Sequence, residues 1–220
     1  MRDWLAGLLG RVRGNGRGIG ARGSVTRWVV LDVETSGLEP AVDRVLAVGA
    51  VAVRAGRDRT RIAMADSLEL FVAQTSPSER ENILVHGIGE AAQRSGLDPA
   101  RASERLRAYL GDSPVVAFHA AFDRGFLSRA LKSWSGHTLG NAWLDVAELA
   151  PALHAEAKGH ALDDWLAHFA IPVDQRHNAC ADALATAMLF VRLLADVPPA
   201  ERDLRGLQKI ASHARWLPRS

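Results

Sequence analysis

The sequence predicts an α/β fold in which one mixed five-stranded sheet is flanked by helices. Early in the chain, an apolar run and two stretches that alternate in polarity follow one another closely, which is typical of antiparallel strands. Further along, short apolar stretches alternate with helical patterns, which is typical of strands that join a sheet in parallel. The chain has 220 residues and is 48% hydrophobic, so it can bury one substantial core.

The expected strands differ in length and in the kind of burial they indicate. The first starts at Trp28 as a continuous apolar run and turns at Gly37. The second and third alternate Val with small or polar residues and are joined by a turn at 56–61, whereas the last two are short, apolar and therefore buried. These later strands are expected at residues 44–54, 67–73, 114–118 and 142–146.

Helical patterns lie between and after the later strands. The first of them places Leu106 and Leu110 on one face, and the last is a long apolar helix for which Asn178 is a suitable N-cap. From residue 79 to residue 96 the pattern weakens, and we expect a loop with a short helix at residues 82–88. The other helices are expected at residues 100–110, 122–131, 161–169 and 180–194.

Both ends of the chain are basic. Residues 1–27 hold 6 Arg against 1 Asp, and residues 198–220 hold 5 Lys or Arg against 2 acidic residues, so the stretch between them carries −6. We expect residues 1–26 to be a flexible Arg/Gly-rich leader, residues 27–197 the folded domain, and residues 198–220 a basic helix or tail. Such ends can contact a phosphate backbone, but a solvated leader and an ordinary charged terminal helix explain them equally well.

Composition excludes several classes of protein. The single cysteine, Cys180, rules out an internal disulfide framework, and no Cys/His cluster has the spacing of a zinc site. No apolar run approaches the roughly 20 residues that a membrane span needs. The apolar patch at the amino terminus is too short and too interrupted for a signal peptide. We therefore expect a cytoplasmic protein without a membrane partner.

Two carboxylates stand at the end of the first strand. Asp32 and Glu34 are two positions apart, so a strand projects them from the same side. Like charges held this close raise each other's pKa unless a positive charge lies between them, and oxygen ligands suit Mg²⁺ or Mn²⁺. The alternative is a pair of solvated carboxylates at a strand-to-loop exit.

Two later segments carry further candidates for the same chemistry. Asp123 follows the fourth strand at the start of a helix, where a side chain faces a cleft, although an acidic residue there also suits the helix dipole. His177 and Asp182 are five residues apart and converge only if His177 lies in a loop and Asp182 in the first turns of the helix. A loop histidine beside a carboxylate-bound metal ion can take a proton from water.

Taken together, Asp32-x-Glu34, Phe122-Asp123 and His177-x4-Asp182 resemble, in order and spacing, the three motifs of the DnaQ-like, DEDDh-type 3′-5′ exonucleases. This group includes DNA polymerase proofreading subunits and RNase T. The resemblance runs from about residue 28 to residue 194 and implies an RNase H-like fold. It also implies that Asp32, Glu34, Asp123 and Asp182 hold two Mg²⁺ or Mn²⁺ ions and that His177 deprotonates the attacking water.

The resemblance also assigns contacts with the substrate, and it has one departure. Phe118 stands where the family usually has His, and His119 stands where it usually has Asn, which we expect to alter substrate preference more than catalysis. The positions that the resemblance assigns to substrate binding are Thr35, Gly37, Leu38, His86, His119 and Phe122.

The leading hypothesis is a metal-dependent 3′-5′ exonuclease that acts on single-stranded 3′ ends of DNA or RNA. As a proofreading subunit it would bind a DNA polymerase, and the apolar residues of the basic tail, Leu204, Leu207, Ile210 and Trp216, either do this or pack on the domain. As a stand-alone repair or RNA-trimming enzyme it needs no polymerase, and relatives of this family are often homodimers. The alternative class is a catalytically inactive, nuclease-like binding module. The sequence leaves the choice of sugar and the oligomeric state open.

Overall fold

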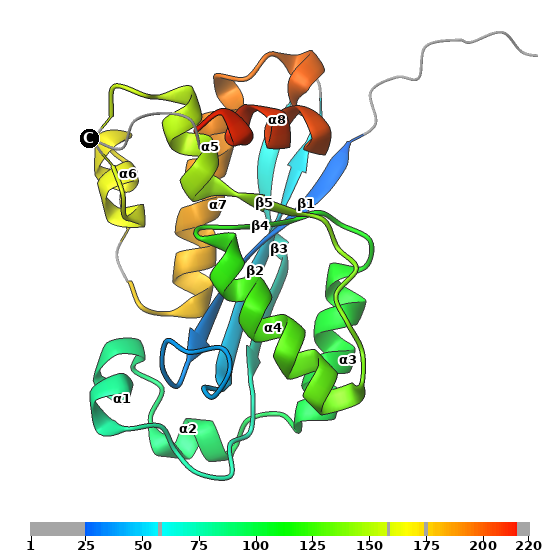
Figure 1. Cartoon of the computed structure of the whole chain (residues 1–220), viewed down its shortest axis with the longest axis vertical. Coiled ribbons are helices and arrows are strands. Elements are labelled where there is room, and N and C mark those ends of the chain that lie inside the picture. Colours follow the sequence, from blue (N-terminus) through cyan, green and yellow to red (C-terminus); the bar gives the residue numbers. More distant parts are fainter. Residues whose placement is uncertain (1–24, 57–58, 158, 174–175, 215–220) are drawn as a thin grey trace, which may run out of the picture.

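The structure, a computed structural model, describes residues 25–56, 59–157, 159–173 and 176–214. Within this part of the chain, five strands form one sheet in the order β3-β2-β1-β4-β5, as Figure 1 shows. Strands β1 to β3 pair antiparallel, whereas β4 and β5 join the other side of β1 in parallel. The bounds are β1 Thr26–Thr35, β2 Val45–Ala55, β3 Thr60–Phe71, β4 Val115–Ala117 and β5 Trp143–Asp145. The predicted mixed five-stranded sheet is confirmed.

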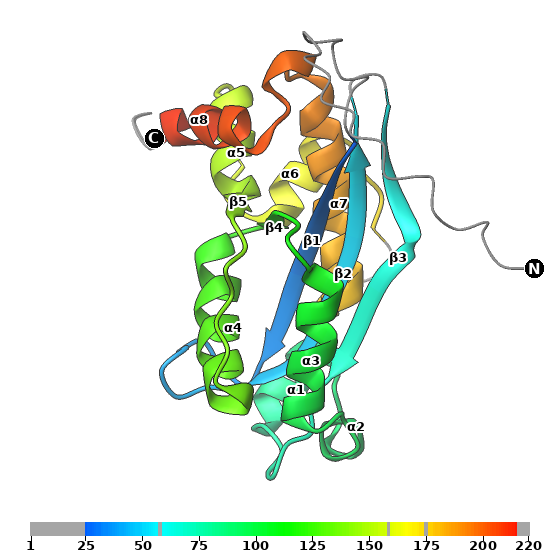
Figure 2. The same cartoon turned by 90° about the vertical axis from the view of Figure 1, so that its right-hand side faces the viewer.

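Helices cover both faces of the sheet and one of its ends. Helices α3 and α4 pack on one face, and α5 to α8 gather on the other, while α1 and α2 lie beyond the end of the sheet (Figures 1 and 2). The bounds are α1 Arg80–His86, α2 Glu90–Arg94, α3 Pro99–Leu110, α4 Ala120–Ser135, α5 Val146–Leu153, α6 Leu162–His168, α7 Ala179–Ala195 and α8 Leu204–Ala214, with a 3₁₀ turn at Pro199–Glu201.

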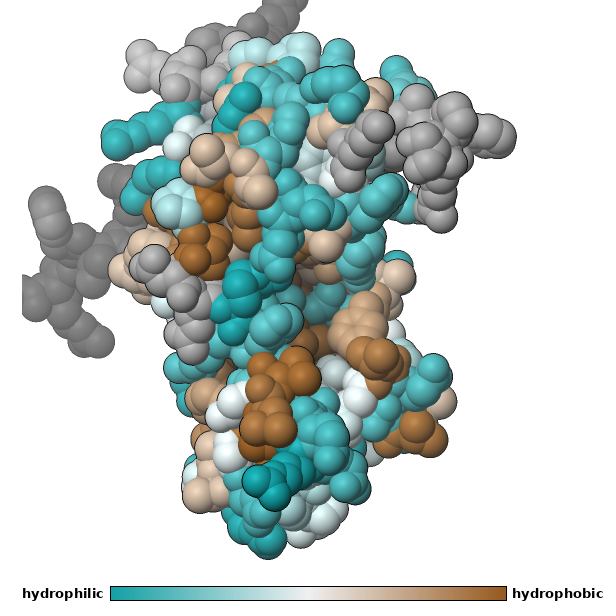
Figure 3. Space-filling model, turned by 90° about the vertical axis from the view of Figure 1, so that its left-hand side faces the viewer, coloured by the Kyte–Doolittle hydropathy of each residue, from teal (hydrophilic) through white to brown (hydrophobic). Residues whose placement is uncertain are grey.

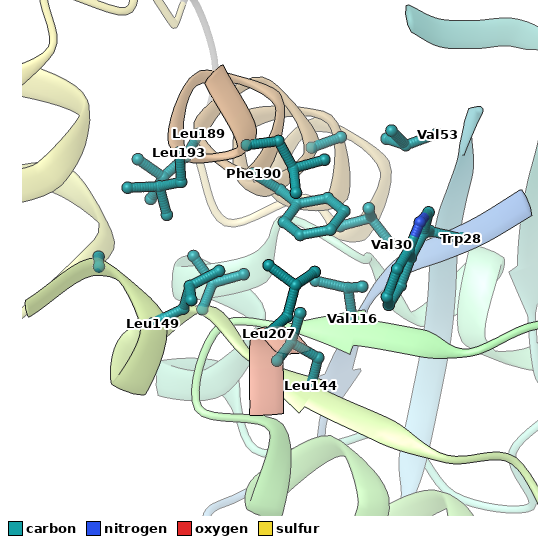
Figure 4. Packing of buried hydrophobic residues seen from close by; sticks show 14 of the residues in the cluster. Trp28, Val30, Val53, Val116, Leu144, Leu149, Leu189, Phe190, Leu193 and Leu207 are labelled. Carbon is teal, nitrogen blue, oxygen red and sulfur yellow. The ribbon is translucent and has the colours of Figure 1, made fainter. Parts of the chain in front are cut away.

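Alternation along β1 divides the core into two layers. Val29, Leu31 and Val33 face α3 and α4, whereas Trp28 and Val30 face α7. Figure 4 shows the second layer, in which the ring of Trp28 meets the ring of Phe190 edge-on at a centroid distance of 5.5 Å. Full burial of one such side chain contributes about 1.5–3 kcal/mol. The same alternation sends the side chains of positions 32 and 34 toward the α7 face.

The carboxyl-terminal helix α8 packs on the domain. Leu207 is fully buried and Ala211 is nearly so, in the same core layer as α5, and Figure 2 shows the two helices side by side. Leu204 and Ile210 are partly buried against that layer. Of the two roles considered for the apolar residues of the tail, packing on the domain is the one that these side chains perform. Trp216 and residues 1–24 of the expected leader lie outside the described residues.

Two elements were mispredicted, and two helices, α2 and α5, were missed. Strand β3 begins at Thr60 rather than at 67, because its first half lies at the edge of the sheet with half-exposed side chains that do not alternate clearly. The helix at 122–131 extends from Ala120 to Ser135. Helix α5 was not expected, since its eight residues contain Pro151 and follow directly on β5. No helix in the described part of the chain is long and apolar enough to cross a bilayer.

Candidate active site

The end of β1 and the start of α7 bring three carboxylates together. Asp32 and Glu34 point toward α7, and Asp182 lies in the first turn of that helix. One oxygen from each of the three side chains lies within 4.8 Å of the others. Asp182 is only 7% exposed, so its charge is largely removed from solvent. The predicted convergence of Asp32, Glu34 and Asp182 is therefore present in the fold.

A glycine on the neighbouring strand lets α7 approach this closely. Gly49 of β2 lies directly opposite Asp32 in the antiparallel pair. A Cβ atom at position 49 would overlap the backbone of Ala179 and Cys180 at the start of α7. Only glycine fits there, and the sequence analysis did not single it out.

Local hydrogen bonds fix the entry into α7. The side chain of Asn178 accepts hydrogen bonds from the backbone N–H groups of Cys180 and Ala181, both at 3.1 Å, which makes it the predicted N-cap. The backbone N–H of His177 donates to Asp182 Oδ2 at 3.1 Å. His177 has a left-handed backbone, with φ of 58°, and its side chain is exposed. His177 therefore lies in the loop before α7 and Asp182 in the first turn of that helix, which is the arrangement that their convergence requires.

Asp123 approaches the same strand from the other helix layer. It lies in the first turn of α4, is 2% exposed, and accepts a hydrogen bond from the backbone N–H of Val33 at 3.1 Å. Val33 stands between Asp32 and Glu34, so Asp123 is held next to the middle of the carboxylate pair. It is near enough to Asp32 for its charge to affect the pKa of that side chain.

Asp145, which the sequence analysis missed, positions the turn that leads to Asp123. Its carboxylate accepts hydrogen bonds from the backbone N–H groups of His119 and Ala120, each at 3.0 Å, and of Ala147 at 2.9 Å. It thereby caps both α4 and α5, and it holds His119 in a left-handed conformation with φ of 60°. An Asp directly after a short buried strand was the available signal.

Burial and mutual repulsion make this site a strong attractor for cations. Burial raises the pKa of Asp32, and the charges of Asp123 and Glu34 raise it further. Burial also raises the pKa of Asp123, against hydrogen bonds from the backbone, and it raises the pKa of Glu34 to about 7. A positive charge placed among these carboxylates offsets both the cost of burying their charges and the repulsion between them.

A guanidinium that the sequence analysis did not anticipate supplies part of that charge. Arg176 pairs with Asp182 through one terminal nitrogen, and its Nε lies 2.6 Å from Asp163 Oδ1 in α6. Its charge opposes the rise in the pKa of Asp32 and of Glu34, although burial outweighs it and both pKa values remain raised. Arg176 therefore links α6 to the carboxylates.

The positions expected to contact substrate fall into two groups. Leu38 is 79% exposed in the loop after β1, and Thr35 and Gly37 are tied together by a hydrogen bond from Thr35 Oγ1 to the carbonyl of Gly37 at 2.6 Å. His119 is exposed at the start of α4, next to Phe122. These positions lie at the end of β1, in the loop that follows it and at the start of α4, next in the chain to Glu34 and Asp123.

The others make contacts within the protein. The ring of Phe122 packs against that of Phe126 at a centroid distance of 4.7 Å, next to the α4 core layer. His86 is buried, with Nδ1 accepting from the N–H of Ile88 at 2.9 Å and Nε2 lying 2.7 Å from Asn82 Oδ1. Both ring nitrogens are thus engaged inside the turn after α1, although His86 and Glu34 line the same small cavity. Phe118, at the position where the family usually has His, packs against the α7 core layer.

The donor set fits a hard divalent cation. Three convergent carboxylates offer only oxygen ligands, and a fourth stands beside them on α4. Fold and site together define a protein with an RNase H-like fold and a cluster of carboxylates on the central strand and the facing helix.

Comparison with known proteins specifies the family. The sequence profile of the exonuclease family that includes RNase T matches residues 29–190, which is most of the chain. The chain therefore belongs to this exonuclease family, and the resemblance to the DnaQ-like group is confirmed. DNA polymerase III PolC-type of Bacillus subtilis is 32% identical over 179 residues, which cover 81% of this chain and 12% of that protein. The chain thus spans only a small part of that relative's length.

Solved structures of exonucleases share the fold. Exonuclease X in complex with 5′ overhanging duplex DNA superposes with a TM-score of 0.64 at 19% identity, covering 84% of this chain and 99% of that one. E. coli exonuclease I in complex with a dA16 oligonucleotide superposes with a TM-score of 0.61 at 18% identity, covering 86% of this chain and 43% of that one. The predicted RNase H-like fold is confirmed.

Proposed function

We propose that this chain is a metal-dependent 3′-5′ exonuclease that hydrolyses the terminal phosphodiester bond of single-stranded 3′ ends. The observation that carries the proposal is the convergence of Asp32, Glu34 and Asp182, with ligand atoms within 4.8 Å of one another. The exposed residue His177 is joined to this cluster through its backbone N–H, which donates to Asp182. Family membership gives this cluster its reaction class. The catalytic unit in this proposal is residues 27–197.

The four carboxylates are proposed to hold two cations. Asp32, Glu34 and Asp182 would hold one Mg²⁺ or Mn²⁺, and Asp123 would share a second with Asp32. When bound, the two ions supply positive charge to the attacking and leaving oxygens of the phosphodiester. The backbone hydrogen bond from Val33 to Asp123 keeps the fourth carboxylate in place for this role.

His177 is the proposed general base. Its backbone is anchored by the hydrogen bond to Asp182, while its side chain extends freely from the loop. Such an imidazole can accept a proton from the attacking water and pass it to solvent. The terminal oxygen of the shortened strand then takes up a proton as the cleaved nucleotide leaves.

Apolar side chains at the edge of the site suit stacked bases. Leu38 in the loop after β1, and Leu84 and Val85 in α1, are 79%, 77% and 59% exposed. Figure 3 shows the side of the molecule that lies to the left in Figure 1, and hydrophobic patches are visible on its lower part, where α1 and the loop after β1 lie. Contacts with the faces of bases tolerate any sequence, as an exonuclease requires. Because the two similar structures hold DNA, we propose single-stranded DNA as the first substrate to test.

The deciding experiment is digestion of matched 5′-labelled DNA and RNA oligonucleotides, resolved on a gel, with Mg²⁺, Mn²⁺ or EDTA. We expect a ladder that shortens from the 3′ end only when metal is present. Asp32→Ala should abolish it, whereas Asp112→Ala, which removes an exposed carboxylate elsewhere, should not. No ladder with any metal would contradict the proposal and favour a nuclease-like binding module. Sedimentation of the same sample tests for a homodimer.

A further inference from the structure

A second group of metal-ligand side chains gathers where α5 meets α6, at a distance along the chain from the carboxylates of β1. His154 ends α5, Glu156 follows in the next turn, and His168 lies in the last turn of α6. One ligand atom from each of the three lies within 4.8 Å of the others. Figure 1 shows α5 and α6 next to each other on one side of the molecule. The spacing of these residues in the sequence does not indicate a metal site, because it is not that of a zinc site.

Hydrogen bonding decides which nitrogen of His154 carries a proton. Nε2 lies 3.0 Å from Asp196 Oδ2, and Arg192 donates to the same oxygen at 2.7 Å. A carboxylate oxygen paired with a guanidinium only accepts, so Nε2 of His154 is the donor. In the neutral ring, Nδ1 therefore carries a lone pair. This arrangement, a histidine whose outer nitrogen donates to a carboxylate, is the one that metal-binding histidines almost always show.

The lone pair of Nδ1 faces a negative charge. Glu156 Oε1 lies 3.5 Å from His154 Nδ1. Two electron-rich atoms that face each other repel unless a proton or a metal ion lies between them. Zinc bonds of about 2.0–2.1 Å to nitrogen and oxygen in a tetrahedral site place two ligand atoms about 3.4 Å apart. The observed separation matches that value and is long for a hydrogen bond.

Aromatic packing holds both imidazoles in orientation. The ring of Phe169 meets the ring of His154 edge-on at 4.9 Å and that of His168 at 4.7 Å, each at 81°. Arg192 lies over the ring of Phe169 at 4.8 Å. The same arginine thus supports Phe169 and Asp196, the two groups that position His154. The side chain of His154 is 16% exposed, so its ring has little freedom to turn.

We propose that His154, Glu156 and His168 form a binding site for a tetrahedral transition-metal ion, with zinc as the first candidate and Asp196 as the outer partner of His154. Two imidazoles and one carboxylate favour zinc and its neighbours over Mg²⁺. The fourth position is open to water. The ion would join the end of α6 to α5, and α6 carries at its start Asp163, the partner of Arg176. The site therefore steadies the helix that holds Arg176 beside the catalytic carboxylates. It stands independently of the proposed nuclease reaction.

The test is titration of the full chain with Co²⁺, read by visible absorption and by calorimetry. Tetrahedral Co²⁺ absorbs far more strongly than octahedral Co²⁺, so the spectrum reports on the ligand geometry. To remove binding at the carboxylates of β1, the titration is done in a background with Asp32→Asn and Glu34→Gln. We expect one equivalent of tetrahedral Co²⁺ that zinc displaces.

Matched variants assign the ligands. In that background, His168→Ala and Glu156→Gln should each weaken binding about 100-fold or more, whereas His137→Ala, another exposed histidine, should leave it unchanged. Asp196→Asn should weaken binding about 10–100-fold and keep the tetrahedral spectrum. Because His168 and Glu156 are exposed, these variants keep the fold, and circular dichroism without metal checks this. The proposal is overturned if the background binds no tetrahedral Co²⁺, or if His168→Ala binds it as tightly as His137→Ala.

Discussion

The raised pKa of Glu34 predicts that ionisation of the active site destabilises the metal-free protein. Burial raises this pKa from its ordinary value of 4.5 to about 7. Between these two values the folded protein keeps a proton that the unfolded chain has lost, so the free energy of unfolding falls as the pH rises. From pH 5 to pH 8, Glu34 alone should lower it by about 2 kcal/mol, once the partial exposure of the side chain is taken into account.

Glu34→Gln isolates this contribution. The amide has the shape of the carboxyl group but does not titrate. Between pH 5 and pH 8, the free energy of unfolding of the variant should therefore fall by about 2 kcal/mol less than that of the wild type. Urea denaturation in EDTA at pH 5, 6, 7 and 8 measures the difference. The buried side chains of Asp32 and Asp123 also make the free energy of unfolding fall as the pH rises, because their pKa values are raised as well. They do so in both the wild type and the variant. Parallel pH profiles for the two proteins would refute this reasoning.

Four further substitutions test other parts of the site and the domain. Gly49→Ala should weaken Mg²⁺ binding and cleavage at least about 10-fold by pushing α7 away, while Gly56→Ala, where a Cβ has ordinary contacts, should not; calorimetry and the digestion assay measure both. Asp145→Ala should lower the free energy of unfolding by about 1–3 kcal/mol, measured in urea, because three backbone N–H groups lose their acceptor, and Asp145→Asn should recover part of it. Arg176→Gln should tighten Mg²⁺ binding about 10-fold in calorimetry, since the guanidinium competes for Asp182; weaker binding would contradict this. Leu207→Ala should cost about 2–5 kcal/mol in urea if α8 is part of the folded domain, and a cost near zero would contradict its packing.

Local rules explain what was predictable about the site. Asp32 and Glu34 share a side because strand side chains alternate, and this holds for any chain in that conformation. Asn178 caps α7 because its side chain reaches the first free N–H groups of the helix, so the approach of Asp182 to the strand pair was also foreseeable. That the early strands pair antiparallel and the later ones join in parallel followed from their pattern of polarity and from the helices between them.

Contacts between distant segments were not predictable in this way. Arg176 pairs with Asp163 on another helix, and Gly49 matters only because α7 crosses β2 at that residue. The ring nitrogens of His86 contact Asn82 and the backbone of Ile88, and nothing in the sequence around His86 indicates this. Each of these depends on how two surfaces meet, and side-chain periodicity within one element contains no information about that.

The sequence by itself determined where the acidic residues of the candidate site stand, because the spacing of Asp32 and Glu34 and the cap of α7 depend on the geometry of single elements. The resemblance of its motifs to a known family indicated the class of chemistry. Only the tertiary structure decided three further features. It places the guanidinium of Arg176 beside the carboxylates, and it lets α7 approach β1 at Gly49 of β2. It also brings His154, at the end of α5, close to His168 in α6. His154 and His168 become neighbours because the packing of two helices against the core places their ends together. That packing is set by the shape and volume of many buried side chains at once, whereas alternation and capping act between residues close in the chain.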